Sequence, residues 1–227
     1  MRLATFNVNG VNGRLPVLLR WLEEKQPEVA CLQELKTSDE KFPEDAIAKA
    51  GYSAIWHGQK SYNGVAILAK GRKPVERRRG LPSPKFEYKL RWFERLRRYA
   101  TDLAAAGQPV ALCGDYNVVP TDIDAVVPKR WVFDAVFFPE SRNEYRLMLA
   151  EGWTDALRKV HPQKGIYTYW NFAFRGGYDK SSGLRMDHLL LNAAAERMLR
   201  AGGVDVDVRG WEKPSDHAPA WIELVRS

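Results

Sequence analysis

Acidic, amide and histidine side chains recur where the apolar runs of this chain begin or end. One such residue alone is most simply a turn or capping residue, because Asp, Asn and Ser fill those roles in most folds. Here five places carry carboxylate, amide or imidazole groups, and together they predict a polar site at the rim of a β-sheet scaffold. These residues are Asn7, Glu34, Asp115 with Asn117, Asp187, and Asp216 with His217.

Four of these side chains are carboxylates, which repel one another unless protons or a cation intervene. Glu34, Asp115, Asp187 and Asp216 offer hard oxygen ligands and no thiolate, which suits Mg²⁺, or alternatively Mn²⁺, rather than zinc. Because Mg²⁺ commonly joins carboxylates to a substrate phosphate, the pattern predicts phosphoryl transfer to water. His217 is the candidate partner for developing charge, since imidazole titrates near neutral pH. In an extended segment the neighbouring Asp216 points the other way, so Asp187 is the predicted partner that orients His217.

Short apolar runs alternate with helical patterns and would position these residues. The predicted strands are Leu3–Phe6, Val29–Gln33, Gly64–Lys70, Val110–Cys113, Asp187–Asn192 and Ala218–Val225. One predicted helix begins near Leu15, with Pro16 in its first turn, and a longer one runs from Phe86 towards Gly107. The alternation by itself favours βαβ units and a parallel sheet.

Composition bounds the class of protein. The 227 residues suit one large α/β domain or two small ones. The net charge of +7 favours a polyanionic partner, nucleic acid first, although housekeeping enzymes are often basic too. Cys31 and Cys113 lie inside apolar runs, which indicates buried free thiols in a reducing compartment. No run approaches 18 apolar residues and the start does not read as a signal peptide, so we expect a cytoplasmic protein that spans no membrane.

Six short motifs, in order along the chain, resemble those of a known family. They are Phe6-Asn7-Val8-Asn9-Gly10, Leu32-Gln33-Glu34-Leu35-Lys36, Gly64-Val65-Ala66-Ile67-Leu68, Gly114-Asp115-Tyr116-Asn117, Arg185-Met186-Asp187 and Ser215-Asp216-His217. Each motif is weak alone, but the ordered set resembles the exonuclease III family of apurinic/apyrimidinic endonucleases, within the endonuclease/exonuclease/phosphatase superfamily. The resemblance implies a four-layered α/β sandwich, with two mixed β-sheets packed face to face and helices outside, as a single domain over residues 1–227. It replaces the parallel sheet that the alternation favours.

The resemblance also implies roles for the polar residues. Glu34 would be the principal metal ligand, with Asn7 nearby and Asp216 contributing to the metal site. Asp115 would position or deprotonate the attacking water, helped by Asn117. His217, oriented by Asp187, would contact the scissile phosphate and stabilise the transition state.

Substrate contacts follow from the same resemblance. Tyr169, Trp170 and Leu184 would form the walls of an apolar pocket for a flipped-out baseless sugar, which has no base to unstack. Core packing is the competing interpretation for these aromatics. Residues in loops that would meet DNA phosphates are Arg14, Lys36, Tyr62, Asn63 and Arg175.

The implied activity is incision of double-stranded DNA 5′ to abasic sites, with 3′-5′ exonuclease or 3′-phosphodiesterase activity on 3′-blocked lesions. The expected partner is DNA and the default state is a monomer. Two alternatives stay open. One is a superfamily relative that hydrolyses another phosphodiester, such as RNA or a phosphoinositide, and the other is a catalytically weakened DNA-binding homologue.

The chain departs from the family pattern after Pro82. A segment of two strands that carries a Tyr-x-Pro-Asn type motif is expected there, yet the long helix follows Pro84 almost at once. Without it the site lacks a phosphate-binding tyrosine and amide, and one sheet exposes strand edges and apolar surface. Three explanations are a segment that the printed chain omits, an engineered deletion, or a natural short relative with rearranged strands. Fold stability favours the first.

Overall fold

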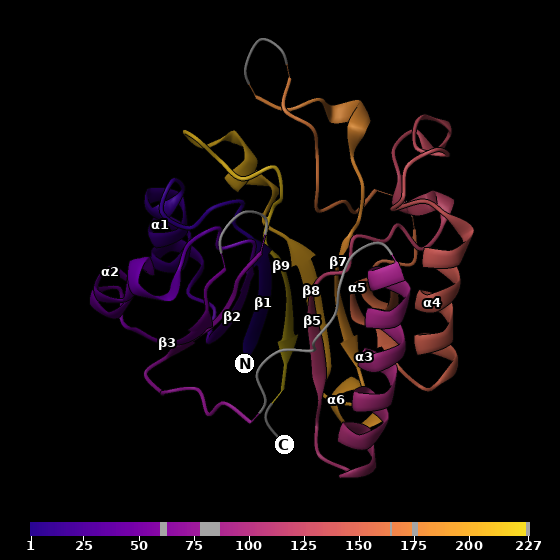
Figure 1. The fold of residues 1–227 in the computed structure, drawn as a ribbon, viewed down its shortest axis with the longest axis horizontal. Helices are drawn as coiled ribbons and strands as arrows, with labels where there is room; N and C mark the ends of the chain where they lie inside the picture. The colour runs from indigo at the N-terminus through magenta and orange to yellow at the C-terminus, as the bar shows by residue number, and fades with distance from the viewer. Residues whose placement is uncertain (60–62, 78–86, 164, 174–176, 226–227) are drawn as a thin grey trace.

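Two β-sheets pack face to face between outer helices in the computed structural model, which describes residues 1–59, 63–77, 87–163, 165–173 and 177–225 (Figure 1). The six-stranded sheet has the order β3 (Tyr52–His57), β4 (Val65–Lys70), β2 (Val29–Gln33), β1 (Arg2–Asn7), β9 (Ala220–Leu224) and β8 (Leu199–Val204). The three-stranded sheet has the order β5 (Ala111–Asp115), β7 (Asp187–Leu191) and β6 (Thr154–Asp155). This is the predicted α/β sandwich.

The parallel sheet that the alternation favours does not form. Among the described strands only β1 and β2 pair in parallel, which makes the larger sheet mixed, while the smaller sheet is antiparallel. The reason lies in the connections: β3 and β4 follow one another closely and pair as antiparallel neighbours, without the helical crossover that parallel pairing requires.

Helices cover the outer faces of the two sheets. In Figure 1, α1 (Leu15–Lys25) and α2 (Glu44–Lys49) lie beyond the six-stranded sheet, whereas α3 (Glu87–Ala105) and α4 (Pro139–Ala150) lie beyond the three-stranded one. The shorter helices are α5 (Ala156–Val160) and α6 (Ala193–Glu196). Single 3₁₀ turns are η1 (Asp39–Lys41), η2 (Asp122–Asp124), η3 (Pro128–Arg130), η4 (Lys180–Ser182) and η5 (Val206–Gly210).

Helix α1 illustrates how the sequence sets these layers. Pro16 stands in its first turn, where a missing N–H costs nothing, as predicted. Its buried side chains recur at helical spacing, so one face packs on the sheet; they are Val17, Leu18, Trp21 and Leu22. Gln26 ends the helix in the left-handed conformation, with its N–H bonded to the Leu22 carbonyl.

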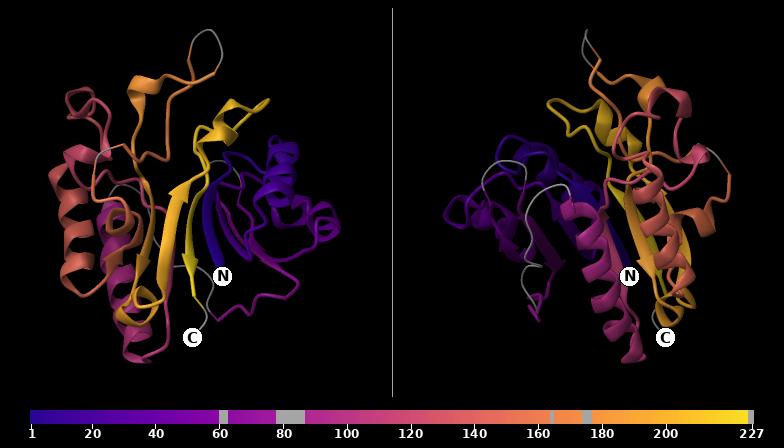
Figure 2. Two further views of the ribbon diagram at one scale, coloured as in Figure 1. Left: turned by 180° about the vertical axis from the view of Figure 1, so that it is seen from behind. Right: turned by 45° about the vertical axis from the view of Figure 1, so that its right-hand side comes forward.

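Three apolar layers hold the sandwich together. Phe6, Leu32 and Trp21 belong to the layer between α1, α2 and the larger sheet, and Leu189 and Ile222 to the layer between the two sheets. The third layer packs α3 and α4 on the smaller sheet through residues such as Phe93, Tyr145, Met148 and Leu190. Seen from behind, the strands again lie between α1 and α2 on one side and α3 and α4 on the other (Figure 2).

Strand topology brings the polar residues to one rim. Asn7 and Gln33 are register partners at the ends of the parallel pair β1 and β2, so Glu34 follows at the same edge. In the smaller sheet Asp115, at the end of β5, pairs directly with Asp187, at the start of β7. Strand β9 runs antiparallel to β1, so the segment before it, with His217, reaches the rim where β1 ends.

Strand β5 forms one edge of the smaller sheet, since within the described residues it pairs with β7 alone. In the larger sheet, Val65 and Ile67 of β4 are 52% and 39% exposed. The predicted gap at residues 82–84 itself lies outside the described residues. No helix of the described residues is long and apolar enough to cross a membrane.

Candidate active site

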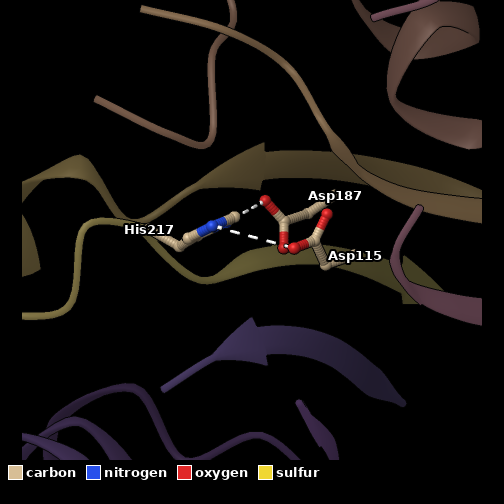
Figure 3. Close-up of side chains that lie close together, drawn as sticks. All are labelled: Asp115, Asp187 and His217. Carbon is tan, nitrogen blue, oxygen red and sulfur yellow. Dashed lines mark hydrogen bonds and ion pairs between the residues drawn. The ribbon is translucent and has the colours of Figure 1, made fainter. Parts of the chain in front are cut away.

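A buried histidine between two aspartates forms the centre of the rim (Figure 3). Nδ1 of His217 lies 2.7 Å from Oδ2 of Asp187, and its Nε2 lies 3.8 Å from Oδ2 of Asp115. Thr168 fixes this end of β7, because its hydroxyl accepts bonds from the backbone N–H groups of Met186 and Asp187 at 3.1 Å each. The predicted pairing partner of His217 is therefore beside it.

The charges of this trio depend on one another. Burial opposes a charged imidazole, but Asp187 and Asp115 outweigh it and raise the pKa of His217 to about 10. Burial also raises the pKa of Asp115 to about 6, although the charge of His217 acts in the opposite direction. At neutral pH the centre therefore holds an imidazolium between carboxylates.

Asn7 connects this trio to Glu34. Its amide nitrogen donates to Oε1 of Glu34 at 2.9 Å and to Oδ2 of Asp115 at 3.0 Å. Glu34 adopts a left-handed backbone conformation, with φ of 51°, which is uncommon for a residue other than glycine. That turn, directly after β2, aims its carboxylate at the rim rather than along the sheet.

A second set of contacts joins Glu34 to Asp216. Nζ of Lys36 lies 3.0 Å from Oε2 of Glu34 and donates to Oδ1 of Asn9 at 2.6 Å. The amide nitrogen of Asn9 in turn donates to Oδ1 of Asp216 at 2.8 Å. Lys36 and Asn9 thus link Glu34 and Asp216, two of the three predicted metal residues, and Asp216 has no described contact to Glu34 itself.

Asn117 and Lys89 order the side of the centre that carries Asp115. The backbone N–H of Asn117 donates to Oδ1 of Asp115 at 2.8 Å, and its side-chain amide to Oδ2 at 3.3 Å. Asn117 is held in a left-handed conformation, with φ of 50°. Lys89 of α3 donates to the carbonyls of Asn117 and Ala135, which anchors this turn. Burial lowers the pKa of Lys89 to about 8, with the charge of Asp115 opposing it.

Part of this set lines a cleft of about 660 Å³, to which His217, Asp187 and Asp216 do not contribute. Its polar end carries Asn7, Glu34, Asp115 and Asn117, and it continues over apolar side chains that include Trp92, Tyr99 and Leu112. The cleft gives the acidic rim direct access to solvent.

The donor set fits a hard divalent cation. The carboxylate of Glu34 is the hard oxygen donor here, because Asn7 turns its amide nitrogen to Glu34 and its amide oxygen to the N–H of Asn9. The Glu34 side chain is 28% exposed, so an ion held by it would keep water ligands. Asp115, Asp187 and His217 also stand close enough together to hold a metal. However, a protonated imidazole has no lone pair to give to a metal. The raised pKa of His217 therefore favours Glu34, rather than this trio, as the place for the ion.

The predicted pocket residues differ in exposure. Tyr169 is half-buried, with its ring edge-on to that of His217 at 5.0 Å between centroids and its hydroxyl bonded to Asn171 at 2.5 Å. Leu184 is buried behind it, bridging to Tyr169. Trp170 is only 5% exposed and packs against Tyr178, which places it in the core of this segment. Tyr169 is therefore the wall residue nearest the histidine.

The predicted phosphate contacts lie around the same rim, as far as they are described. Lys36 contacts Glu34 and Asn9, as above, and Asn63 is exposed, with its carbonyl accepting from the N–H of Lys36 at 2.9 Å. Arg14 stands at the N-terminus of α1, one turn beyond Gly10. Tyr62 and Arg175 lie outside the described residues.

Sequence reasoning gave no role to four residues that order the site, although two of them stand in the motifs above: Asn9, Lys89, Thr168 and Ser215. The spacing Asn7-Val8-Asn9 was a usable signal for Asn9, since both amides follow the same strand. Ser215 donates to the carbonyl of Asn7 at 2.7 Å and accepts from the N–H of His217 at 3.2 Å, so it fixes the histidine relative to β1. No local pattern marks Lys89, whose role follows only from the packing of α3.

A two-sheet α/β sandwich with an acidic, amide and histidine rim defines a class of metal-dependent phosphoester hydrolases, and comparison with known proteins specifies the family. The sequence matches the Endonuclease/Exonuclease/phosphatase family over residues 4–217. The chain therefore belongs to this family.

Individual relatives agree with this assignment. The chain is 32% identical to Exodeoxyribonuclease III of Haemophilus influenzae, covering 99% of the chain and 100% of that protein. Among solved structures, an AP endonuclease from Archaeoglobus fulgidus matches with a TM-score of 0.92 at 30% identity, and a 3′ phosphatase from Neisseria bound to a product DNA hairpin with 0.89 at 33%. Both structural matches cover 100% of each chain.

Proposed function

We propose that this chain is a metal-dependent DNA repair phosphodiesterase that incises DNA 5′ to abasic sites and also trims 3′-blocked ends. The observation that carries the proposal is the contact of His217 with Asp187 and Asp115, joined through Asn7 to Glu34. The activities for which the Haemophilus, Archaeoglobus and Neisseria relatives are named support DNA as the substrate. The net charge of +7 supports it too, because a phosphate backbone attracts basic proteins.

Glu34, Asn7 and Asp216 are the residues we assign to the metal, with Mg²⁺ the expected ion and Mn²⁺ the alternative. When bound, the ion would neutralise non-bridging phosphate oxygens and stabilise the charge of the transition state. Lys36 offsets part of the negative charge of Glu34. The same lysine stands where a DNA phosphate would approach the rim.

Asp115 is the residue we assign to the attacking water. With a pKa of about 6 it is mostly ionised at neutral pH, so it accepts a proton or a hydrogen bond from water. Asn117 holds both carboxylate oxygens of Asp115 and thereby fixes its orientation.

His217 is the residue we assign to the scissile phosphate. Asp187 accepts from Nδ1, which leaves Nε2 as a donor on the side of Asp115. A charged donor at that place stabilises a phosphate that gains negative charge during attack.

Tyr169 and Leu184 are the residues we assign to the baseless sugar. An abasic nucleotide needs no base unstacking to turn out of the duplex, so we assign its selection to the apolar side chains of Tyr169 and Leu184 beside His217. Trp170 is buried in the same segment. A monomer in the cytoplasm, associated with DNA through its substrate, is the accompanying proposal.

One assay tests the function directly. The chain is incubated with a duplex that carries a single abasic analogue, in Mg²⁺ and in chelator, beside the Glu34→Ala variant. Incision 5′ to the lesion that both chelator and Glu34→Ala abolish is the expected result. Salt-dependent binding without incision would instead support the catalytically weakened DNA-binding homologue, and cleavage of RNA or a phosphoinositide in preference to DNA would support the other alternative.

A further inference from the structure

A buried arginine lies where the pocket segment and the catalytic segment meet. Arg209, in η5, is 1% exposed, and its guanidinium donates to the carbonyl of Ser215 and, at 3.1 Å, to that of Trp170. Aromatic rings of Phe172 and Tyr178 lie over it, each with its centroid 5.1 Å away. An arginine is rarely so deeply buried without partners, and here the two carbonyls accept from its terminal nitrogens, while Nε has no hydrogen-bond partner in the described structure.

The two segments that Arg209 joins are held together by few backbone bonds. The N–H of Trp170 donates to the carbonyl of Asp216 at 3.0 Å, and the N–H of Ala218 donates to that of Thr168 at 2.7 Å. Tyr169 and His217 form a single bridge between them. A pairing this short is weak by itself, because strands gain stability from longer ladders.

The guanidinium extends this pairing by one step. One terminal nitrogen donates to the carbonyl of Ser215 and the other to that of Trp170. Both carbonyls lie next to the Trp170–Asp216 bond, so the guanidinium joins the two segments where their backbone pairing ends. Because guanidinium is planar and forked, it fixes the separation of the two carbonyls as well as their presence. A lysine in its place has one nitrogen and cannot hold both with the same geometry.

We propose that Arg209 is a positioning residue that sets the distance between the pocket wall Tyr169 and the phosphate-contacting His217. The inference rests on the proposed function, which gives those two residues their roles. Without the arginine, the pocket segment shifts relative to His217, and a bound abasic sugar no longer presents its phosphate at the right place. The rate of cleavage at undamaged 3′ ends, which do not need the pocket, should fall less.

The test compares Arg209→Lys with wild type on an abasic duplex and on undamaged 3′ ends. We expect kcat on the abasic duplex to fall about tenfold or more, the amount of one charge-assisted hydrogen bond, with a smaller change in KM. Selectivity for the abasic duplex should fall with it. In Arg209→Gly, millimolar guanidinium should restore part of the loss, since it refills the same cavity.

Arg2→Ala is the matched control for lost stability. Arg2 is also a partly buried arginine, bonded to Asp205 at 3.0 Å and lying over Trp221, but it stands at the opposite end of β1 from Asn7. Thermal unfolding of both variants is measured beside activity. If Arg209→Lys keeps the kcat, KM and selectivity of wild type, as Arg2→Ala should, the proposal is overturned.

A measurement without substrate separates this inference from the proposed function. The chain has four histidines, so the ring resonances of His217 can be assigned by NMR. Arg209→Lys should shift them and Arg2→Ala should not. An inactive wild type would sink the proposed function alone, whereas unchanged His217 resonances in Arg209→Lys would sink the positioning role.

Discussion

Nδ1 of His217 lies 2.7 Å from Oδ2 of Asp187, and this contact joins the smaller sheet to the segment that precedes β9 in the larger one. Asp187 is completely buried and its other oxygen, Oδ1, has no hydrogen-bond partner in the described structure. An ionised carboxylate so placed depends on a cation for its stability, and His217 supplies that charge. The pair is thus a structural joint between the sheets at the place to which we assign the chemistry.

Asp187→Asn tests the charge in this pair. The amide keeps the volume of the side chain, but it no longer stabilises an imidazolium by charge, so the pKa of His217 falls from its raised value towards that of a free imidazole. We expect kcat on an abasic duplex to fall roughly 100-fold or more, the usual range for general acid–base groups, with unchanged far-ultraviolet circular dichroism. A kcat close to that of wild type would mean that His217 acts without its partner.

Alkaline stability reports the same pair without substrate or metal. The pKa of His217 is raised from 6.5 to about 10, so its stabilising contribution is fully present below pH 6.5 and is lost as pH rises through 10. In chelator, the free energy of unfolding of wild type should fall by a few kcal/mol across this window, because the protonated imidazole contributes about 1.4 kcal/mol per pH step between the two pKa values. His217→Gln should remove this fall and leave only the slopes of other groups, such as Lys89, whose lowered pKa of about 8 makes its own contribution rise with pH. Equal slopes in the two proteins would contradict the assignment.

Strands that consist of a continuous apolar run could be predicted from the sequence. A strand that depends on pairing with an adjacent strand, and has no such run, could not. Strand β2 has the predicted bounds Val29–Gln33, and β1 differs from the prediction by one residue at each end. Strand β8 was missed because Gly202 and Gly203 stand inside it, and glycine weakens the strand pattern. Its pairing with β9 is what makes it a strand.

The site was predictable where residues follow strands and unpredictable where packing brings them in. Glu34 and Asp115 each follow an apolar run, so their types and places indicated a common rim. Lys89 reaches the same cleft from α3, a helix whose packing no spacing rule fixes.

The predicted gap near Pro82 stays a prediction, because residues 82–84 lie outside the described residues. The alignment with the Haemophilus relative runs over 269 residues, whereas this chain has 227. An intact mass well above 25.9 kDa would establish that the protein carries a segment which the printed chain omits.

Glu34→Gln tests the metal assignment. The amide is a weaker ligand for a hard cation and no longer attracts one by charge, so the Mg²⁺ concentration for half-maximal activity should rise about tenfold or more. Titration of activity with Mg²⁺ and Mn²⁺ measures it. Glu223→Gln, on the exposed side of β9, is the matched control and should behave as wild type. The same Mg²⁺ dependence in both variants would move the metal site away from Glu34.

Asp124→Asn tests the buried ion pairs beneath the smaller sheet. Asp124 is 1% exposed and contacts Arg185 at 2.7 Å as well as Arg158, and burial is outweighed by these partners, which lower its pKa to about 2. Its stabilising contribution is present above pH 3.8 and is lost as pH falls through 2. We expect urea unfolding at pH 7 to show a loss of roughly 3–5 kcal/mol, since Arg185 is left buried with less compensation.

Asp122→Asn, two residues away in the same 3₁₀ turn, is the control for that variant. Its carboxylate is 71% exposed and meets Arg142 at the surface, so its removal should cost well under about 1 kcal/mol. Equal losses in the two variants would show that the turn itself, rather than the buried pairs, sets the stability.

Tyr169→Ala tests the pocket wall. The ring contacts that of His217 edge-on and its hydroxyl is held by Asn171, so the substitution opens the recess that we assign to the baseless sugar. We expect kcat/KM on an abasic duplex to fall about tenfold or more, the amount of one lost aromatic wall, while trimming of undamaged 3′ ends changes little. Tyr167→Ala is the control, because that ring packs on Trp170 and not on His217. If abasic incision and 3′ trimming fall by the same factor in Tyr169→Ala, the ring supports the histidine in general and is not the wall that selects the lesion.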